Sequence, residues 1–165
     1  MPRTIRFALT ALTALLALTG QAYAGSATTT FDARLVVQAQ CKFTTANAMD
    51  FGTTGLLDKD TSVTSTLNVM CTNKAPYTIA LNAGNTTGST VASRLMASAA
   101  KDTVKYNIYS DAARTSIWGN TEGTDTVGGT GSGAEQTLTL YGKVPVQNTP
   151  PSGNYTSTVT ATVTF

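Results

Sequence analysis

Apolar residues recur at every second position along most of the chain, and this period of two limits the fold more than any other feature. The last eleven residues show it best, because Tyr155, Val159 and Phe165 share one parity while threonines fill most of the other. The alternation recurs in five earlier segments, which are residues 31–39, 63–71, 77–81, 104–108 and 138–140. Such alternation is typical of strands with one buried and one solvent-exposed face.

Turn-forming residues separate these segments. Stretches rich in Gly, Asn or Pro occur at 52–55, 82–85 and 150–153, and a glycine-rich run at 127–133 is expected to be a flexible hairpin loop. That run lacks a Gly-Lys-Ser/Thr ending and no helical pattern follows it, so we do not expect it to hold a phosphate. Seven or more short strands in about 140 residues predict an all-β fold, an antiparallel β-sandwich in one domain.

The first 24 residues have the pattern of a signal peptide. Arg3 and Arg6 supply the basic region, residues 7–18 the apolar stretch, and Ala22-Tyr23-Ala24 a cleavage site of small residues. The apolar stretch is short and interrupted by threonines, which argues against a membrane anchor. The sequence therefore predicts export through the inner membrane and a mature chain of residues 25–165.

The composition excludes several classes of function. The chain contains no histidine, so it cannot form a Ser-His-Asp triad, a Cys-His dyad or any metal site that needs histidine. Loss of Arg3 and Arg6 with the signal peptide leaves nine basic and nine acidic residues. A neutral mature chain argues against binding to nucleic acid or to an anionic membrane surface. Threonine makes up 33 of the 165 residues, as suits an exported β-protein.

The two cysteines permit one disulfide. Export makes a Cys41–Cys71 bond chemically permissible, and it would close a loop worth roughly 3.6 kcal/mol in the chain-entropy model. The alternative is two buried free thiols. Two thiols without histidine would make a poor zinc site, so no metal is expected.

No pair of carboxylates is marked as catalytic. The nine carboxylates are Asp32, Asp50, Asp58, Asp60, Asp102, Asp111, Glu122, Asp125 and Glu135, most of them in expected loops. Asp58-Lys59-Asp60 does not match a calcium loop, and we expect a solvated turn there. The segment from Asp111 to Arg114 is expected to be a turn held by a local ion pair or by a capped backbone amide. We expect neither enzymatic activity nor a cofactor.

Several phrases of the sequence resemble one protein family. They are Met49-Asp50-Phe51-Gly52, residues 67–72 with 76–81, Arg94-Leu95-Met96, residues 106–115 with Trp118-Gly119, and residues 140–145 with 153–165. Together they resemble the spore coat protein U domain, a family that includes subunits of archaic, Csu-type chaperone–usher pili. The resemblance covers residues 28–165, and Tyr-Asn-Ile-Tyr-x-Asp-Ala-Ala-Arg-Thr is its most specific part.

The resemblance implies an incomplete immunoglobulin-like antiparallel β-sandwich that lacks its last strand. It also implies assembly by donor-strand exchange, in which a periplasmic chaperone lends a strand and an outer-membrane usher exchanges it for a neighbour's N-terminal extension. The partners would be copies of the chain or related pilins, and the destination a surface pilus that supports adhesion and biofilm formation. No catalytic residue comes with the family.

The two ends of the chain fit this implication. Residues 25–37 form a spare alternating extension whose donor face would be Phe31, Ala33, Leu35 and Val37, with Phe31 and Ala33 the safer choices. The alternation at the other end runs to the last residue, so Val159, Ala161, Val163 and Phe165 are expected to face the groove or to pair with the chaperone. The alternative is an ordinary sandwich in which residues 31–41 pair within their own chain. Two other classes of protein stay open: a secreted spore-coat or matrix protein assembled without an usher, and a sugar-binding sandwich that uses Trp118 and surface tyrosines.

Overall fold

The computed structural model describes residues 24–165, so the expected signal peptide lies, except for Ala24, outside the described residues. The chain divides into two compact units between Leu35 and Val36. Residues 24–40 contain no strand or helix. Among residues 24–165 there is no helix long and apolar enough to cross a membrane.

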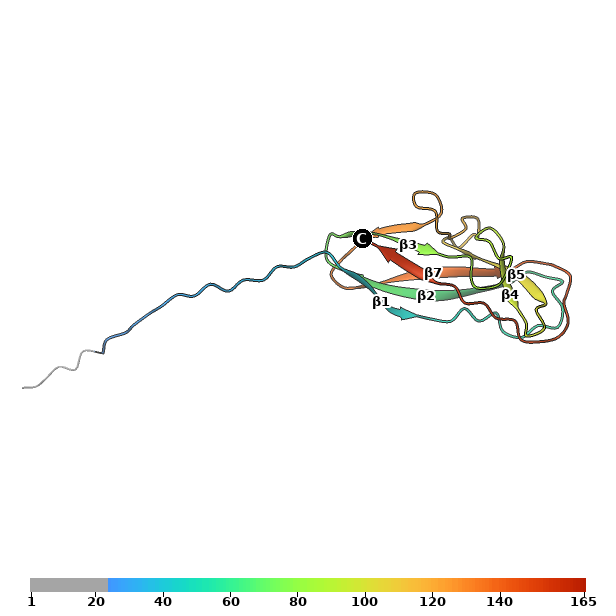
Figure 1. Ribbon diagram of the computed structural model, residues 1–165, viewed down its shortest axis with the longest axis horizontal. Helices are drawn as coiled ribbons and strands as arrows, with labels where there is room; N and C mark the ends of the chain where they lie inside the picture. Colours follow the sequence, from blue (N-terminus) through green and yellow to red (C-terminus); the bar gives the residue numbers. More distant parts are fainter. Residues whose placement is uncertain (1–23) are drawn as a thin grey trace, which may run out of the picture. The chain divides into compact units, whose positions relative to one another are not determined.

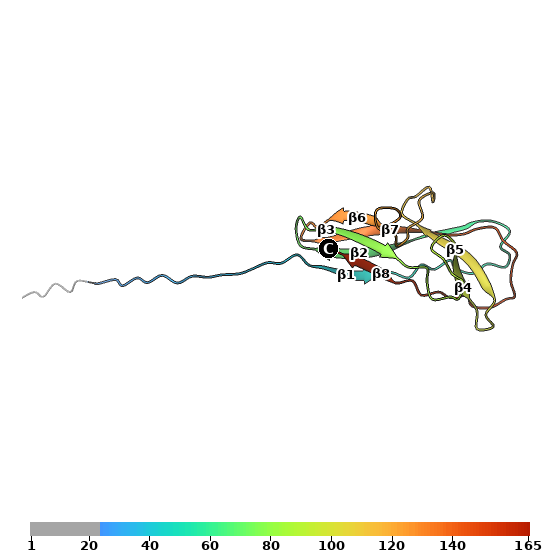
Figure 2. The same ribbon diagram turned by 45° about the horizontal axis from the view of Figure 1, so that its top comes forward.

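Eight strands build the second unit. They are β1 (Cys41–Ala46), β2 (Thr61–Cys71), β3 (Pro76–Leu81), β4 (Arg94–Ala97), β5 (Thr103–Tyr109), β6 (Val127–Thr130), β7 (Glu135–Val144) and β8 (Ala161–Thr164). One sheet has the order β1-β2-β7-β5-β4 and the other β6-β3-β8, and every pairing is antiparallel. The edge strands β1 and β8 lie side by side (Figures 1 and 2). The all-β antiparallel sandwich expected from the sequence is confirmed.

The core consists of the residues that the alternation placed on one parity. Leu67, Val69 and Cys71 of β2 are buried, and so are Tyr77, Ile79 and Leu81 of β3. Burying each large apolar side chain contributes about 1.5–3 kcal/mol, so the alternation itself drives the two sheets together. Threonines on the opposite parity of β2, such as Thr64 and Thr66, are exposed or half-buried.

A buried cation closes one end of this core. Arg94 of β4 is fully buried, and its guanidinium donates to the carbonyl oxygens of Leu81, Asn82 and Trp118 and to the Asn107 Oδ1 at 2.7 Å. Burial lowers the pKa of Arg94, because removal from water disfavours the charged form. Through these hydrogen bonds the guanidinium links β3, β5 and the loop at 118 to one another.

The glycine-rich run at 127–133 is not a loop throughout, and that expectation was wrong. Residues Val127–Thr130 form β6, which pairs with β3. The aromatic ring of Tyr77 lies so close to Gly129 that any Cβ there would overlap it. Glycine is therefore needed for close packing of this edge strand. The high turn propensity of glycine is the reason that the sequence predicted a loop here.

The alternating segment at 31–39 is not a strand in the single chain, although the sequence predicted one. The first strand begins at Cys41, and at the other end only Ala161–Thr164 of the expected strand 155–165 is assigned as β8. A strand requires a neighbour that pairs with its N–H and C=O groups, and alternation of side chains does not supply one.

Candidate functional site

A groove of about 1060 Å³ runs between the two edge segments of the sandwich. One wall is the segment 46–57, which follows β1, and the other is the segment 149–161, which precedes and enters β8. The floor is apolar and consists of core side chains, namely Leu67, Leu81, Met96, Val104, Tyr106, Ile108, Leu140 and Val144. Six of these eight side chains are buried, and Met96 and Leu140 are half-buried, so the groove gives partial access to the inside of the sandwich along one edge.

The wall at 46–57 rests closely on the floor. Phe51 meets Tyr106 edge-on, with ring centroids 6.0 Å apart. Met49 and Phe51 both pack over Gly142 of β7, which leaves room for them by having no side chain. Neither Met49 nor Phe51 was expected at the site, although the phrase Met49-Asp50-Phe51-Gly52 is one of those that resemble the family.

Within the wall at 149–161, residues 156–160 are bonded to their own chain on one side only. Thr156 exchanges backbone hydrogen bonds with Ala97, and the Thr160 carbonyl accepts from the Asn82 N–H. Beyond Thr160, β8 pairs with β3 and with no second strand among the described residues. Hydrogen-bonding groups alternate between the two sides of a strand, so the odd-numbered residues here direct theirs to the open side.

The four residues expected at the groove have different surroundings. Val159 and Ala161 line the groove, and Val163 is half-buried against the core. Phe165 is 55% exposed and does not line the groove. The assignment of this strand to groove filling or chaperone pairing stays a prediction.

The four expected donor residues are all exposed in the single chain. Phe31 is 89% exposed, Leu35 87% and Val37 71%, and Ala33 is also exposed. Among residues 24–165, large apolar side chains this exposed otherwise occur only at Val36. All residues from 24 to 40 are exposed, so this exposure does not distinguish the expected donor face from its opposite face, and the donor role stays a prediction.

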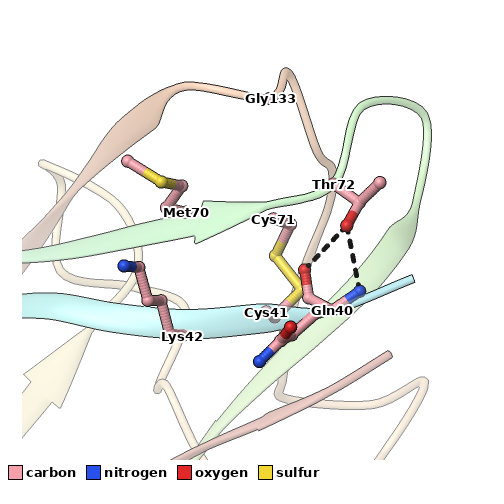
Figure 3. A pocket seen from close by; sticks show the side chains of 7 residues that line it. All are labelled: Gln40, Cys41, Lys42, Met70, Cys71, Thr72 and Gly133. Atoms are coloured by element: carbon pink, nitrogen blue, oxygen red, sulfur yellow. Dashed lines mark hydrogen bonds between the residues drawn. A yellow bond between two sulfur atoms is a disulfide. The ribbon is translucent and has the colours of Figure 1, made fainter. Parts of the chain in front are cut away.

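The predicted disulfide is present. Cys41 and Cys71 are directly opposite each other in the β1–β2 pair and are bonded. The Thr72 hydroxyl accepts from the Gln40 N–H at 3.0 Å beside this bond (Figure 3). The disulfide and this hydrogen bond fix the point at which the N-terminal segment enters the sheet.

The other candidate residues have structural surroundings. The Asp111 carboxylate accepts from the N–H groups of Thr115 and Ser116, so this turn has the capped-amide form rather than the ion pair. Trp118 is buried and its indole N–H donates to the Ile79 carbonyl at 2.9 Å, so its ring cannot stack on a sugar. Within residues 24–165, no three His, Cys, Asp or Glu side chains gather to form a metal site.

Residues 58–60 include an exposed bend, in agreement with the expected solvated turn, and Asp60 is paired there. Its carboxylate lies 2.6 Å from the Lys143 Nζ atom and accepts from the Val146 N–H. These two contacts lower the pKa of Asp60, the Lys143 hydrogen bond being the larger cause. The ion pair anchors the start of β2 to the end of β7 and lies outside the groove.

Comparison with known proteins agrees with the resemblance drawn from the sequence. A curated relative, Protein U of Myxococcus xanthus, is 33% identical over 177 residues, which cover 99% of this chain and 98% of that protein. A solved structure with a similar fold is the CsuC–CsuE chaperone–tip adhesion subunit pre-assembly complex from archaic chaperone-usher Csu pili of Acinetobacter baumannii. The match has a TM-score of 0.58 and 22% identity, and covers 78% of this chain but only 40% of the matched chain. Residues 27–162 match the Spore Coat Protein U domain, so the chain belongs to that family.

Proposed function

We propose that the chain is a structural subunit of a surface pilus, assembled by donor-strand exchange and without a catalytic role. The observation that carries this proposal is the open groove, flanked by a strand whose outer side has no partner among the described residues. An unpaired strand edge beside a partly accessible apolar groove would promote aggregation, so we infer that a partner strand covers both.

The exposed N-terminal segment is the partner strand that we propose. It carries Phe31, Ala33, Leu35 and Val37 on one parity, as a strand needs in order to fill an apolar groove. Burying the three large members would contribute roughly 5–9 kcal/mol before the ordering entropy is subtracted. That is comparable to the whole stability of a small domain, so complementation would change the stability greatly.

Export and accessory proteins belong to the same proposal. We propose that the chain crosses the inner membrane with its signal peptide, is held in the periplasm by a chaperone and passes through an outer-membrane usher. The pilus would then support adhesion and biofilm formation. The solved chaperone–subunit complex of similar fold supports the chaperone step of this proposal.

A second candidate is a secreted coat or matrix protein that assembles without an usher. The family's description as a Spore Coat Protein U domain favours it, together with the similarity to Protein U of Myxococcus xanthus over nearly the whole of both chains. Co-purification separates the two. A pilin expressed in its native host should be recovered with a periplasmic chaperone, whereas a coat protein of this second kind should not.

Grafting the N-terminal segment onto the other end of the chain tests whether the groove accepts a strand. Residues 26–38 are moved behind Phe165 on a short flexible linker, so that the segment can fill the groove of its own chain. We expect a soluble monomer that melts far above the ungrafted chain and does not polymerise, as measured by thermal unfolding and size-exclusion chromatography.

The matched control is the same graft with Phe31→Asp and Leu35→Asp, which keeps the length but removes two apolar contacts. This control should lose the gain in melting temperature. If the ungrafted chain is already an equally stable monomer without a chaperone, the groove needs no strand and the proposal fails.

A further inference from the structure

We infer that Asn82 and Asn85 are positioning residues that hold one wall of the groove ready to accept a strand. The inference rests on the proposed function, because it concerns the same groove. Both residues belong to the stretch 82–85, for which the sequence analysis predicted only a turn.

The wall runs beyond the end of the strand that supports it. Strand β3 ends at Leu81, opposite Ala161, so residues 155–160 have no continuous strand beside them. Backbone bonds hold this stretch at Thr156, through Ala97, and at Thr160, through the Asn82 N–H. The N–H groups of Thr158 and Thr160 have no backbone acceptor in this arrangement.

Two asparagine side chains supply the missing acceptors. The Asn85 Oδ1 accepts from the Thr158 N–H at 2.8 Å, and the Asn82 Oδ1 accepts from the Thr160 N–H at 2.9 Å. The Asn82 Oδ1 also accepts from the Gly84 N–H, which ties the turn to the wall. The two asparagine side chains therefore accept the hydrogen bonds that backbone carbonyls of β3 would accept if that strand were longer.

This arrangement selects which backbone groups face the groove. With the N–H groups of Thr156, Thr158 and Thr160 bonded inward, those of the odd-numbered residues point to the open side. Consistent with this, the N–H groups of Ser157 and Val159 have no acceptor within residues 24–165. The free edge thus includes 157, 159, 161 and 163 rather than only the two positions in β8.

The occupant that fits this edge is the donor segment of a second copy. Ser157 to Val163 spans seven residues with four alternate free positions, and Phe31 to Val37 spans seven residues with four alternate apolar side chains. An edge limited to β8 would pair with only about half of that segment. Asn82 and Asn85 therefore set the length of strand that the groove accepts.

The experiment measures binding of a fluorescent synthetic peptide of residues 26–38 to the full chain. The chain carries Phe31→Asp and Leu35→Asp so that its own segment does not compete. In that background, Asn82→Ala with Asn85→Ala should weaken peptide binding about tenfold, as expected for two lost backbone hydrogen bonds. Amide hydrogen exchange at Thr158 and Thr160 should quicken in the same variant.

Conservative variants separate positioning from general stability. Both side chains act here only as acceptors, so Asn82→Asp with Asn85→Asp should restore binding to within about twofold of the parent. Asn120→Ala, at an exposed position outside the groove, is the matched control and should leave binding and exchange unchanged. Because Asn85 is itself exposed, the single Asn85→Ala change should fold and speed exchange at Thr158 even if the double variant does not fold.

The outcomes distinguish the two proposals. If the parent binds the peptide and the alanine variants bind it equally well with unchanged exchange, the inference is wrong and the proposed function stands. If the parent itself does not bind the peptide, the donor-strand function and this inference fall together.

Discussion

Gly142 of β7 lies directly under the side chain of Met49, so that a Cβ atom at position 142 would overlap the Met49 Sδ atom and press on the Phe51 ring. Gly142 is on the inward parity of β7, together with the groove-lining Leu140 and Val144. The wall at 46–57 can approach the sheet only because this position has no side chain. The width of the groove therefore depends on a glycine outside its lining.

This relationship predicts the effect of a side chain at position 142. Gly142→Val should displace Met49 and Phe51 and destabilise the chain by about 1–3 kcal/mol, as overpacking usually does. Urea unfolding gives the cost in stability, and peptide binding should weaken in the same variant. Gly55→Val is the control for stability alone, because nothing lies within 4 Å of a Cβ at that position, although Gly55 lines the groove. Equal effects of the two changes would contradict the prediction.

The disulfide should contribute strongly to stability. Cys41→Ser with Cys71→Ser opens a loop whose ends are 30 residues apart in sequence and should cost roughly 3–4 kcal/mol. The loss follows because the unfolded chain regains the entropy that the bond removed. Urea unfolding of the native and doubly substituted chains measures it. Titration of two free thiols in the native protein would show that the bond does not form.

Arg94 should be essential to the closed end of the core. Arg94→Met removes the donors that satisfy the carbonyls of Leu81, Asn82 and Trp118 and leaves these groups buried without partners. We expect a loss of about 3 kcal/mol or more, measured by chemical unfolding. Arg34→Met, at a highly exposed arginine, should change stability little. A stable Arg94→Met variant would show that water replaces the guanidinium without cost.

Asp111 should make stability depend on acidic pH. Hydrogen bonds from the Ser116 N–H, and then from Thr115, lower the pKa of Asp111 below its ordinary value of 3.8. A carboxyl with a lowered pKa stabilises the fold above its unfolded pKa, and this contribution is lost as pH falls through the lower, folded pKa. Asp111→Asn should therefore destabilise the chain at about pH 6, with the difference from wild type shrinking towards pH 2.5. Urea midpoints at the two pH values test this, and a constant difference would contradict it.

The last strand should be needed for chaperone pairing under the proposed function. In β8, Ala161 and Val163 direct their backbone groups to the unpaired side of the strand. Deleting Val163–Phe165 removes the second of these positions, together with the contact between the Val163 side chain and the core. We expect the truncated subunit to lose its chaperone complex and to be degraded in the periplasm. Pull-down of the tagged subunit measures this. Recovery of the chaperone at normal yield would exclude a role for these residues.

The strands that could be predicted are those whose side chains alone identify them. Residues 63–71, 77–81 and 104–108 alternate strictly, and each lies within an observed strand. β6 was missed because Gly128 and Gly129 carry no side chain and therefore no alternation. The signal for β6 lies in Tyr77, a residue distant in sequence that covers Gly129.

The candidate site likewise contains one feature that the sequence predicts and others that it does not. The pairing of Cys41 with Cys71 needed only a count of cysteines and a compartment, and it is confirmed. Asn82 and Asn85 carry typical turn chemistry, and nothing local indicates that their side chains bond to Thr160 and Thr158. Each of these two contacts joins residues more than 70 positions apart in the chain.

By itself the sequence determined the all-β class, the inward parity of the alternating segments that form strands and the single available disulfide, because each depends on neighbouring side chains or on a count. Only the tertiary structure decided which strand edges stay unpaired and where the core is open. A backbone N–H or C=O is the same in every residue, so its partner is set by whatever the fold brings beside it. Residues 31–37 and 155–163 alternate alike, and yet one segment lies fully exposed while the other forms a wall of the groove.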